Sequence, residues 1–137
     1  MLRHSGLRIR DAVTLSRERI SDGRLLLYTA KSGTPVHLPL PRFVLDTLEA
    51  TGRGGQLYFW SGVSKPESAA SDWRRSLAKV FELAKIHDGH PHRLHDAFAV
   101  ELFLAGVPLE RVSILLGHQT LKITERHYAP WVRARQE

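Results

Sequence analysis

Cysteine is absent from this chain of 137 residues, which excludes a disulfide scaffold and every thiolate metal site. The absence fits a reducing compartment, so we expect a cytoplasmic protein. No run of the sequence approaches the roughly 18 consecutive apolar residues that a membrane span needs, and no secretory hydrophobic stretch follows Met1. We therefore expect no membrane partner.

Acidic residues are also scarce, with 14 Asp and Glu against 20 Lys and Arg, which gives a net charge of +6. The length corresponds to one domain, and the 42% hydrophobic and 25% charged residues are typical of a globular protein. A compact basic domain of this kind usually meets a polyanion, most often nucleic acid. The alternative is a charge that serves only solubility.

The first half of the chain predicts short helices followed by a β-hairpin. Residues 1–15 are typical of the end of one helix, a turn and a second helical stretch. Alternating apolar residues over 35–40 pair with the run 24–30 around a Ser-Gly turn, which places Lys31 close to the tip of a hairpin. A short helix is expected over 41–50, ending at Gly52, and the apolar run 57–60 fits a strand or a packed loop.

The second half predicts helices throughout. The clearest is 68–86, with an apolar stripe on one face. Further helices are expected over 93–105, 109–116 and 121–128, with the last one ended by Pro130. The sequence thus predicts a mainly α domain with a small antiparallel β-sheet, of the α+β class.

Five separated pieces of the sequence carry chemistry. They are Ser5-Gly-Leu-Arg8, the hairpin residue Lys31, His92, the segment Leu115-Leu-Gly-His118 and Tyr128. In this order the set resembles the catalytic domain of tyrosine recombinases, the phage-integrase family of site-specific DNA recombinases. The most specific segments are 105–118 and 124–128, and the resemblance covers essentially the whole chain.

The resemblance implies a DNA breaking and rejoining fold, and a role for each matching residue. Tyr128 would be the nucleophile that takes the 3′-phosphate, and Arg8 a phosphate-clamping arginine. Lys31 would protonate the departing 5′ oxygen or contact a neighbouring base, and His92 and His118 would complete the phosphate site. Cleavage of this type needs cationic side chains around the phosphate rather than a metal, so no cofactor is expected. Double-stranded DNA is the implied partner, with self-association into a tetramer on DNA.

The sequence departs from the family in two places. The box His92-Arg93-Leu94-His95 ends in histidine where the family has its second clamping arginine. An imidazole there helps only when protonated, so we expect slow cleavage at pH 7.5 and faster cleavage near pH 6. The family also carries an N-terminal DNA-binding domain, and we expect residues 1–137 to form one catalytic domain without it.

Other functions remain open from the sequence. The chain could be a noncatalytic DNA-binding remnant of an integrase that keeps its basic face. The histidines 87, 90, 92 and 95 could form a metal cluster, although their spacings are short and mixed. A type IB topoisomerase shares the chemistry, but the chain resembles the integrase branch more closely.

Overall fold

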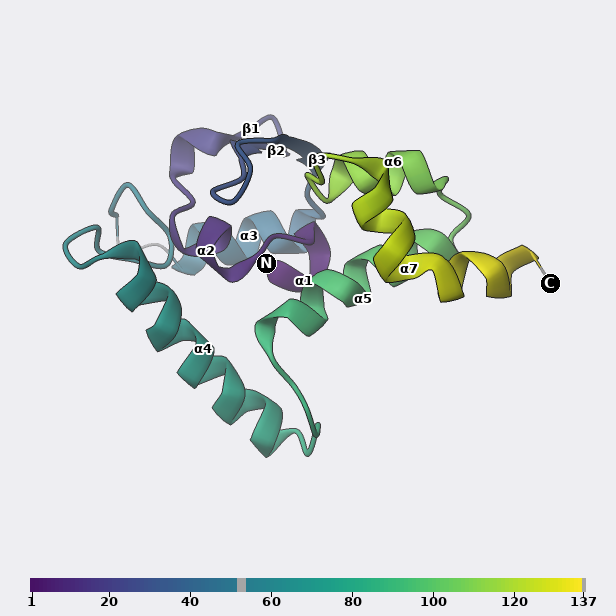
Figure 1. Cartoon of the computed structure of the whole chain (residues 1–137). Helices are drawn as coiled ribbons and strands as arrows, with labels where there is room; N and C mark the ends of the chain where they lie inside the picture. Colours follow the sequence, from purple (N-terminus) through teal and green to yellow (C-terminus); the bar gives the residue numbers. More distant parts are fainter. Residues whose placement is uncertain (52–53, 137) are drawn as a thin grey trace.

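The computed structural model describes residues 1–51 and 54–136 and confirms a mainly helical domain with one small antiparallel sheet (Figure 1). The elements are α1 (Leu2–Ser5), α2 (Ile9–Val13), η1 (Arg17–Arg19), β1 (Ile20–Ser21), β2 (Arg24–Tyr28), β3 (Pro35–Pro39), α3 (Arg42–Thr51), α4 (Pro66–Leu83), α5 (Pro91–Leu104), α6 (Leu109–Leu115) and α7 (Leu121–Gln136).

The hairpin forms as the alternation of apolar residues predicts. Strands β2 and β3 pair antiparallel with Leu25 opposite Leu38 and Leu27 opposite Val36, and these four side chains are buried. The pairing of β1 with the other edge of β2 was not predicted. β3 is an edge strand, which suits prolines at both of its ends.

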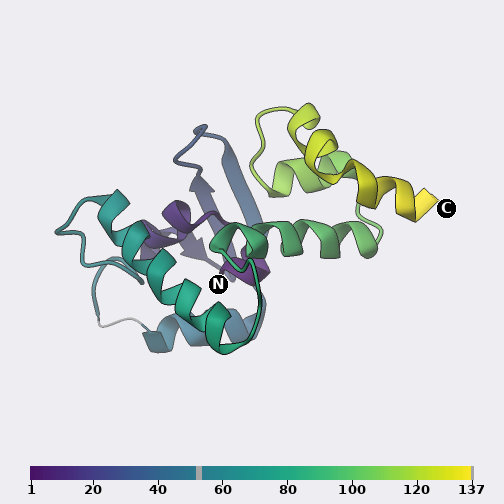
Figure 2. The same cartoon turned by 60° about the horizontal axis from the view of Figure 1, so that its bottom comes forward.

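Two apolar cores hold the domain together. The first packs the inner face of the sheet against α1, α2 and α3, and the second joins Phe103 of α5, Val112 of α6 and Tyr128 of α7. Helix α5 extends from the sheet region to α6 and α7, so it belongs to both halves (Figure 2). The guanidinium of Arg3 on α1 forms a two-pronged ion pair with Glu101 of α5, which fixes the first helix against it.

Two glycines allow segments that carry candidate site residues to pack closely against neighbouring elements. Gly6 has φ +65°, and a Cβ there would lie 2.4 Å from Phe98 of α5. Gly117 has φ +69°, and a Cβ there would lie 2.7 Å from Val36 of β3. A side chain at either position would be strained in its backbone and would collide. The two glycines therefore bring the segment before Arg8 onto α5 and the segment before His118 onto the hairpin.

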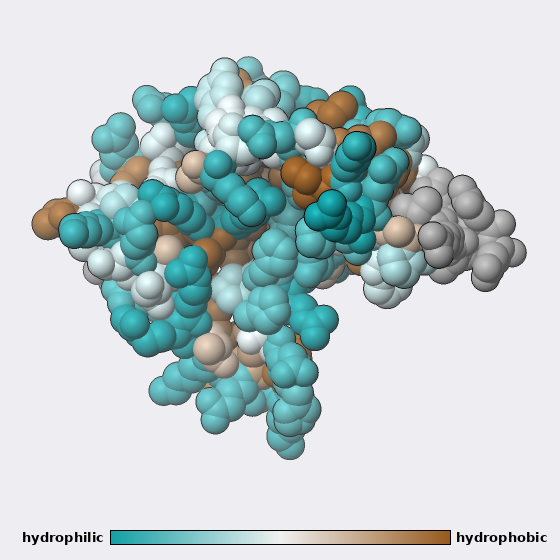
Figure 3. All heavy atoms as spheres, viewed as in Figure 1, coloured by the Kyte–Doolittle hydropathy of each residue, from teal (hydrophilic) through white to brown (hydrophobic). Residues whose placement is uncertain are grey.

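Helix α4 differs from its expected packing. Its apolar stripe predicts one buried face, but the helix packs mainly through Ala69, Ala70 and the partly buried Leu77, while Val80 of the stripe is 57% exposed. Figures 1 and 3 show the second half projecting from the body, with hydrophobic side chains visible in the recess beside it. Periodicity predicted the amphipathic helix correctly but does not supply a partner for its whole length.

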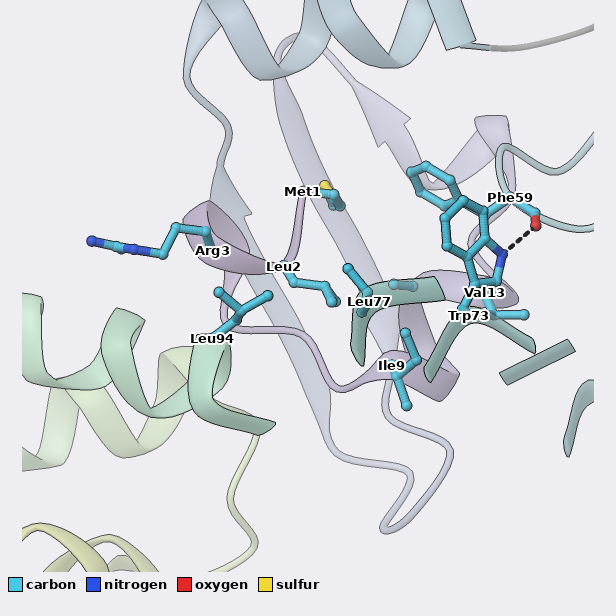
Figure 4. Close-up of a pocket in the computed structure, with 10 residues that line it drawn as sticks. Met1, Leu2, Arg3, Ile9, Val13, Phe59, Trp73, Leu77 and Leu94 are labelled. Atoms are coloured by element: carbon cyan, nitrogen blue, oxygen red, sulfur yellow. Dashed lines mark hydrogen bonds between the residues drawn. The ribbon is translucent and has the colours of Figure 1, made fainter. Parts of the chain in front are cut away.

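A small apolar hollow lies where the first half of α4 meets α1 and α2. It has a volume of about 240 Å³ and is lined mainly by apolar side chains, and Figure 4 labels nine of its ten lining residues. Trp73 closes one side, with its indole Nε1 donating a hydrogen bond of 2.8 Å to the Phe59 carbonyl (Figure 4).

Several boundaries also differ from the predictions. α5 begins at Pro91, so His92 lies inside its first turn rather than before the helix. α7 does not end at Pro130 but continues to Gln136 and bends along its length (Figure 1), because an interior proline can kink a helix instead of stopping it. The run 57–60 is a loop with one isolated bridge between Leu57 and Ser16. The expected stop at Gly52 lies outside the described residues.

Candidate active site

Arg8 stands at the mouth of a basic hollow. It is the residue that precedes the first turn of α2, and it lines a hollow of about 380 Å³ with Arg10, Arg74, His90 and His92 among its neighbours. Arg10 is already paired with Glu67 at 2.7 Å. The Arg8 guanidinium forms no hydrogen bond or ion pair with another described residue, so its donors are available to an anion.

The three predicted histidines lie side by side as a cluster of rings. His92 and His95 lie three positions apart on α5 and share a face, with ring centroids 4.9 Å apart. The ring of His118, which follows the turn after α6, lies 5.9 Å from that of His95 and is tilted by 49° to it. The His118 Nδ1 atom is 2.6 Å from the Thr124 hydroxyl, and a hydroxyl that donates there leaves the proton of His118 on Nε2.

His95 is 1% exposed and is fixed by the backbone. Its Nδ1 is hydrogen-bonded to the carbonyl oxygen of Gly6. Because a carbonyl oxygen only accepts, the proton of the neutral ring is on Nδ1, and Nε2 carries a lone pair. A neutral His95 in this tautomer offers an acceptor, not a donor, to a phosphate oxygen.

The three histidines are uncharged at neutral pH. Burial lowers the pKa of His95 to about 4, and the nearby positive charge of Arg8 acts in the same direction. Burial and then the neighbouring His95 lower the pKa of His118 to about 4, and burial also lowers that of His92. His95 is therefore not protonated near pH 6 in the free protein, which removes the physical reason for expecting faster cleavage at that pH.

Tyr128 is packed and hydrogen-bonded at the same time. The residue is 4% exposed, and its ring lies 5.6 Å from that of Phe103. Its hydroxyl donates to Asp96 Oδ1 at 2.8 Å. Burial, then this hydrogen bond and the carboxylate charge, raise the pKa of Tyr128 well above its usual range. The phenol is thus held in its protonated form.

Lys31 makes no hydrogen bond or ion pair with the described residues of this cluster. It is exposed in the turn between β2 and β3, and its ammonium has no hydrogen bond or ion pair with any other described residue. The turn itself is tied to α2, because the Ala30 N–H donates to Asp11 Oδ1 at 2.8 Å. Asp11 is buried on α2, so the hairpin and the segment that begins with Arg8 are held together near the base of this turn.

The structure thus brings together Arg8, the three histidines and Tyr128, whereas Lys31 has no interaction with them among the described residues. The charge of Arg8 acts on the pKa values of His92, His95, His118 and Tyr128, which places all of them in one electrostatic environment. Sequence reasoning missed two carboxylates, Asp11 and Asp96. Their spacings, three positions after Arg8 and four after His92, were the available signals, since both spacings share a helical face.

The described residues give the metal cluster no geometric support. Among them, no three histidine, aspartate or glutamate side chains converge on a point that could hold a metal ion. The rings of His90 and His92 are stacked at 6.5 Å, and His87 is exposed in the loop before them. In the same part of the chain, no helix has the length and apolar character needed to cross a bilayer.

The sequence profile of the phage integrase family matches residues 1–132. The chain belongs to the phage integrase family. Among curated proteins, no sequence match was found.

Solved structures of tyrosine recombinases have the same fold. The catalytic domain of bacteriophage HP1 integrase is 20% identical with a TM-score of 0.68, and the alignment covers 97% of this chain and 72% of that one. XerA recombinase is 16% identical with a TM-score of 0.71, covering 94% of this chain and 54% of that one. XerH recombinase bound to a difH substrate, in a post-cleavage complex, is 17% identical with a TM-score of 0.74, covering 97% and 41%. The chain therefore spans about half or less of the longer recombinases.

Proposed function

We propose that this domain cleaves and rejoins double-stranded DNA through a covalent 3′-phosphotyrosyl link to Tyr128. The observation that carries the proposal is the convergence of an unpaired Arg8, a cluster of histidine rings and Tyr128 within a member of the integrase family. A covalent intermediate conserves the energy of the broken phosphodiester, so the strand can be rejoined without another energy source.

Each residue has a role that its chemistry supports. The planar guanidinium of Arg8 donates to the nonbridging oxygens, where charge gathers in the transition state. His118 in the tautomer set by Thr124, together with His92, adds neutral donors. Lys31 on the exposed turn reaches the phosphate when DNA is bound and protonates the departing 5′ oxygen.

His95 is the weak point of this set. A neutral ring that presents a lone pair cannot replace the fork of a second arginine. Losing one preorganised donor costs about 10²–10³ in rate. The same observation favours a second candidate function, a noncatalytic DNA-binding remnant.

A suicide substrate separates the two functions. A nicked duplex that loses its 5′ fragment on cleavage traps the covalent complex, which migrates as a shifted band and can be mapped by mass spectrometry. We expect a slow adduct on Tyr128 in the wild type and none in Tyr128→Phe, which lacks only the nucleophilic oxygen. An adduct that persists in Tyr128→Phe contradicts the nucleophile assignment, and no adduct in either protein supports the remnant.

DNA binding itself is expected to be weak and strongly dependent on salt. The chain covers only 41% of XerH, which was solved in complex with a difH substrate, so we expect fewer contacts with DNA than the longer protein can make. The chain's net charge of +6 makes the remaining attraction mainly electrostatic. Released counterions should make the affinity fall steeply between about 50 and 200 mM salt. Fluorescence anisotropy with a labelled duplex measures this, and a flat salt profile contradicts it. Sedimentation of the same complexes tests the proposed self-association on DNA.

A further inference from the structure

The Asp96 carboxylate is the acceptor that contacts the hydroxyl of Tyr128 in the described structure. The Tyr128 Oη to Asp96 Oδ1 distance of 2.8 Å is that of a well-formed hydrogen bond. Two histidines of the cluster have other partners, His95 the Gly6 carbonyl and His118 the Thr124 hydroxyl, each through Nδ1. A proton that leaves the phenol therefore has one partner already in place.

The surroundings of Asp96 favour that transfer. His92 Nε2 lies 3.6 Å from the same Oδ1 atom, one helical turn earlier on α5. Asp96 and Tyr128 also line a shared hollow of about 350 Å³, together with Arg93, His127 and Trp131 among others. The Asp96 carboxylate raises the pKa of the Tyr128 hydroxyl, whereas the positive charge of Arg8 lowers it. Asp96 thus lies beside an opening through which solvent can take the proton away.

We propose that Asp96 is the general base that accepts the proton of Tyr128 during strand cleavage. The inference rests on the proposed function and adds a catalytic residue to it. As the Tyr128 oxygen forms its bond to phosphorus, its proton moves to Asp96 Oδ1, and the bond from phosphorus to the 5′ oxygen breaks. The 5′ oxygen leaves with the bonding electron pair and takes a proton from the general acid. In rejoining, the protonated Asp96 returns its proton to the tyrosine as the 5′-hydroxyl attacks.

The proton transfer and the attack occur in one step. Burial first, and then the carboxylate that accepts the proton, keep the resting phenol protonated, so no phenolate accumulates in the absence of DNA. The hydrogen bond therefore serves both states, because it orients the nucleophile at rest and receives its proton in the transition state.

Isosteric substitution separates a base from a merely structural contact. Asp96→Asn keeps an oxygen that can accept the phenol hydrogen bond but cannot take its proton, whereas Asp96→Ala removes both. Asp46→Asn is the matched control, since it makes the same chemical change at an exposed helical carboxylate paired with Arg42. Circular dichroism and thermal unfolding show whether each variant is folded, and Asp96→Glu restores a carboxylate if the others are not.

The experiment measures single-turnover adduct formation on a normal duplex and on one with sulfur as the bridging 5′ atom, which leaves without needing a proton. General-base catalysis contributes about 10²–10⁴-fold, so we expect Asp96→Asn to be at least 100-fold slower than the wild type on both substrates. Asp46→Asn should match the wild type, and Asp96→Glu should recover part of the rate.

An Asp96→Asn rate within threefold of the wild type on the sulfur substrate overturns the assignment and leaves a positioning contact. If Asp96→Asn cleaves faster than the wild type, the general-base assignment is overturned, and the hydrogen bond from Tyr128 to Asp96 instead restrains the nucleophile. In either case the wild-type adduct still supports the proposed function. If the wild type forms no adduct on either substrate, the proposed function fails, and the base assignment fails with it.

Discussion

The two sides of the candidate site are built differently. On the side of α5, α6 and α7, the histidine rings and Tyr128 are packed, stacked and hydrogen-bonded to their neighbours. On the side of α2 and the hairpin, Arg8 and Lys31 have their charged groups unpaired among the described residues. The histidines and Tyr128 of the first side are preassembled but uncharged, and the second side carries the free positive charges. Under the proposed function, stabilisation of the phosphate depends mainly on the cations of the second side.

Removal of Arg8 should have the largest effect. We expect Arg8→Ala to lower the single-turnover cleavage rate by about 10²–10³, roughly 3–4 kcal/mol, because His95 provides no second cationic donor. Adduct formation on the suicide substrate measures it, with Arg42→Ala on α3 as the control at an exposed arginine. A loss of less than threefold would show that the first side carries the stabilisation.

The second-largest expected effect is a loss of folding stability in acid, because His95 is buried as a neutral ring. The pKa of His95 is about 4 in the folded protein and near 6.5 in the unfolded chain, so the unfolded chain binds more protons between these values. Stability is fully present above pH 6.5 and falls as the pH drops toward 4, with about 2 kcal/mol lost from this residue at pH 5. Urea unfolding at pH 7.5 and pH 5 measures the loss.

The control for this loss is His95→Gln, which cannot titrate. Its stability should fall less between the two pH values than that of the wild type, by about the same 2 kcal/mol. Equal losses in both proteins would show that His95 is not held neutral by burial.

The smallest expected effect is the change in cleavage rate when an arginine replaces the neutral His95. We expect His95→Arg to raise the rate at pH 7.5 by at least tenfold, about 1.4 kcal/mol, since a guanidinium donates two hydrogen bonds at any usable pH. The measurement pairs both proteins on the nicked substrate, with thermal unfolding to detect crowding at this buried position. If His95→Arg leaves the rate unchanged and the wild type already cleaves efficiently, the site does not need a second arginine at position 95.

The sequence predicted those features that follow from local patterns. Alternation over 35–40 gave the hairpin and its inward Val36 and Leu38, and helical spacing placed His92 and His95 on one face. It could not show that α7 brings Tyr128 onto Asp96, because that contact joins residues 32 positions apart through the packing of two helices.

Other misses have the same physical origin. The stripe of α4 predicted burial, but the burial of Val80 depends on a partner that no periodicity encodes. The charge state of His95 also depends on tertiary structure, since its depressed pKa comes first from burial against other elements. Local sequence patterns therefore predict which residues share a face of a helix or strand, whereas tertiary packing determines their burial and their charge state.

The central claim is that the histidine side is assembled but uncharged. Titration of the imidazole resonances by NMR, assigned with His95→Gln and His118→Gln, tests it most directly. The account predicts that His95 and His118 each titrate near pH 4 in the free protein and stay neutral from pH 6 to 7.5. Titration of either ring at pH 6.5 or above would contradict it, and would restore His95 as a cation for the phosphate.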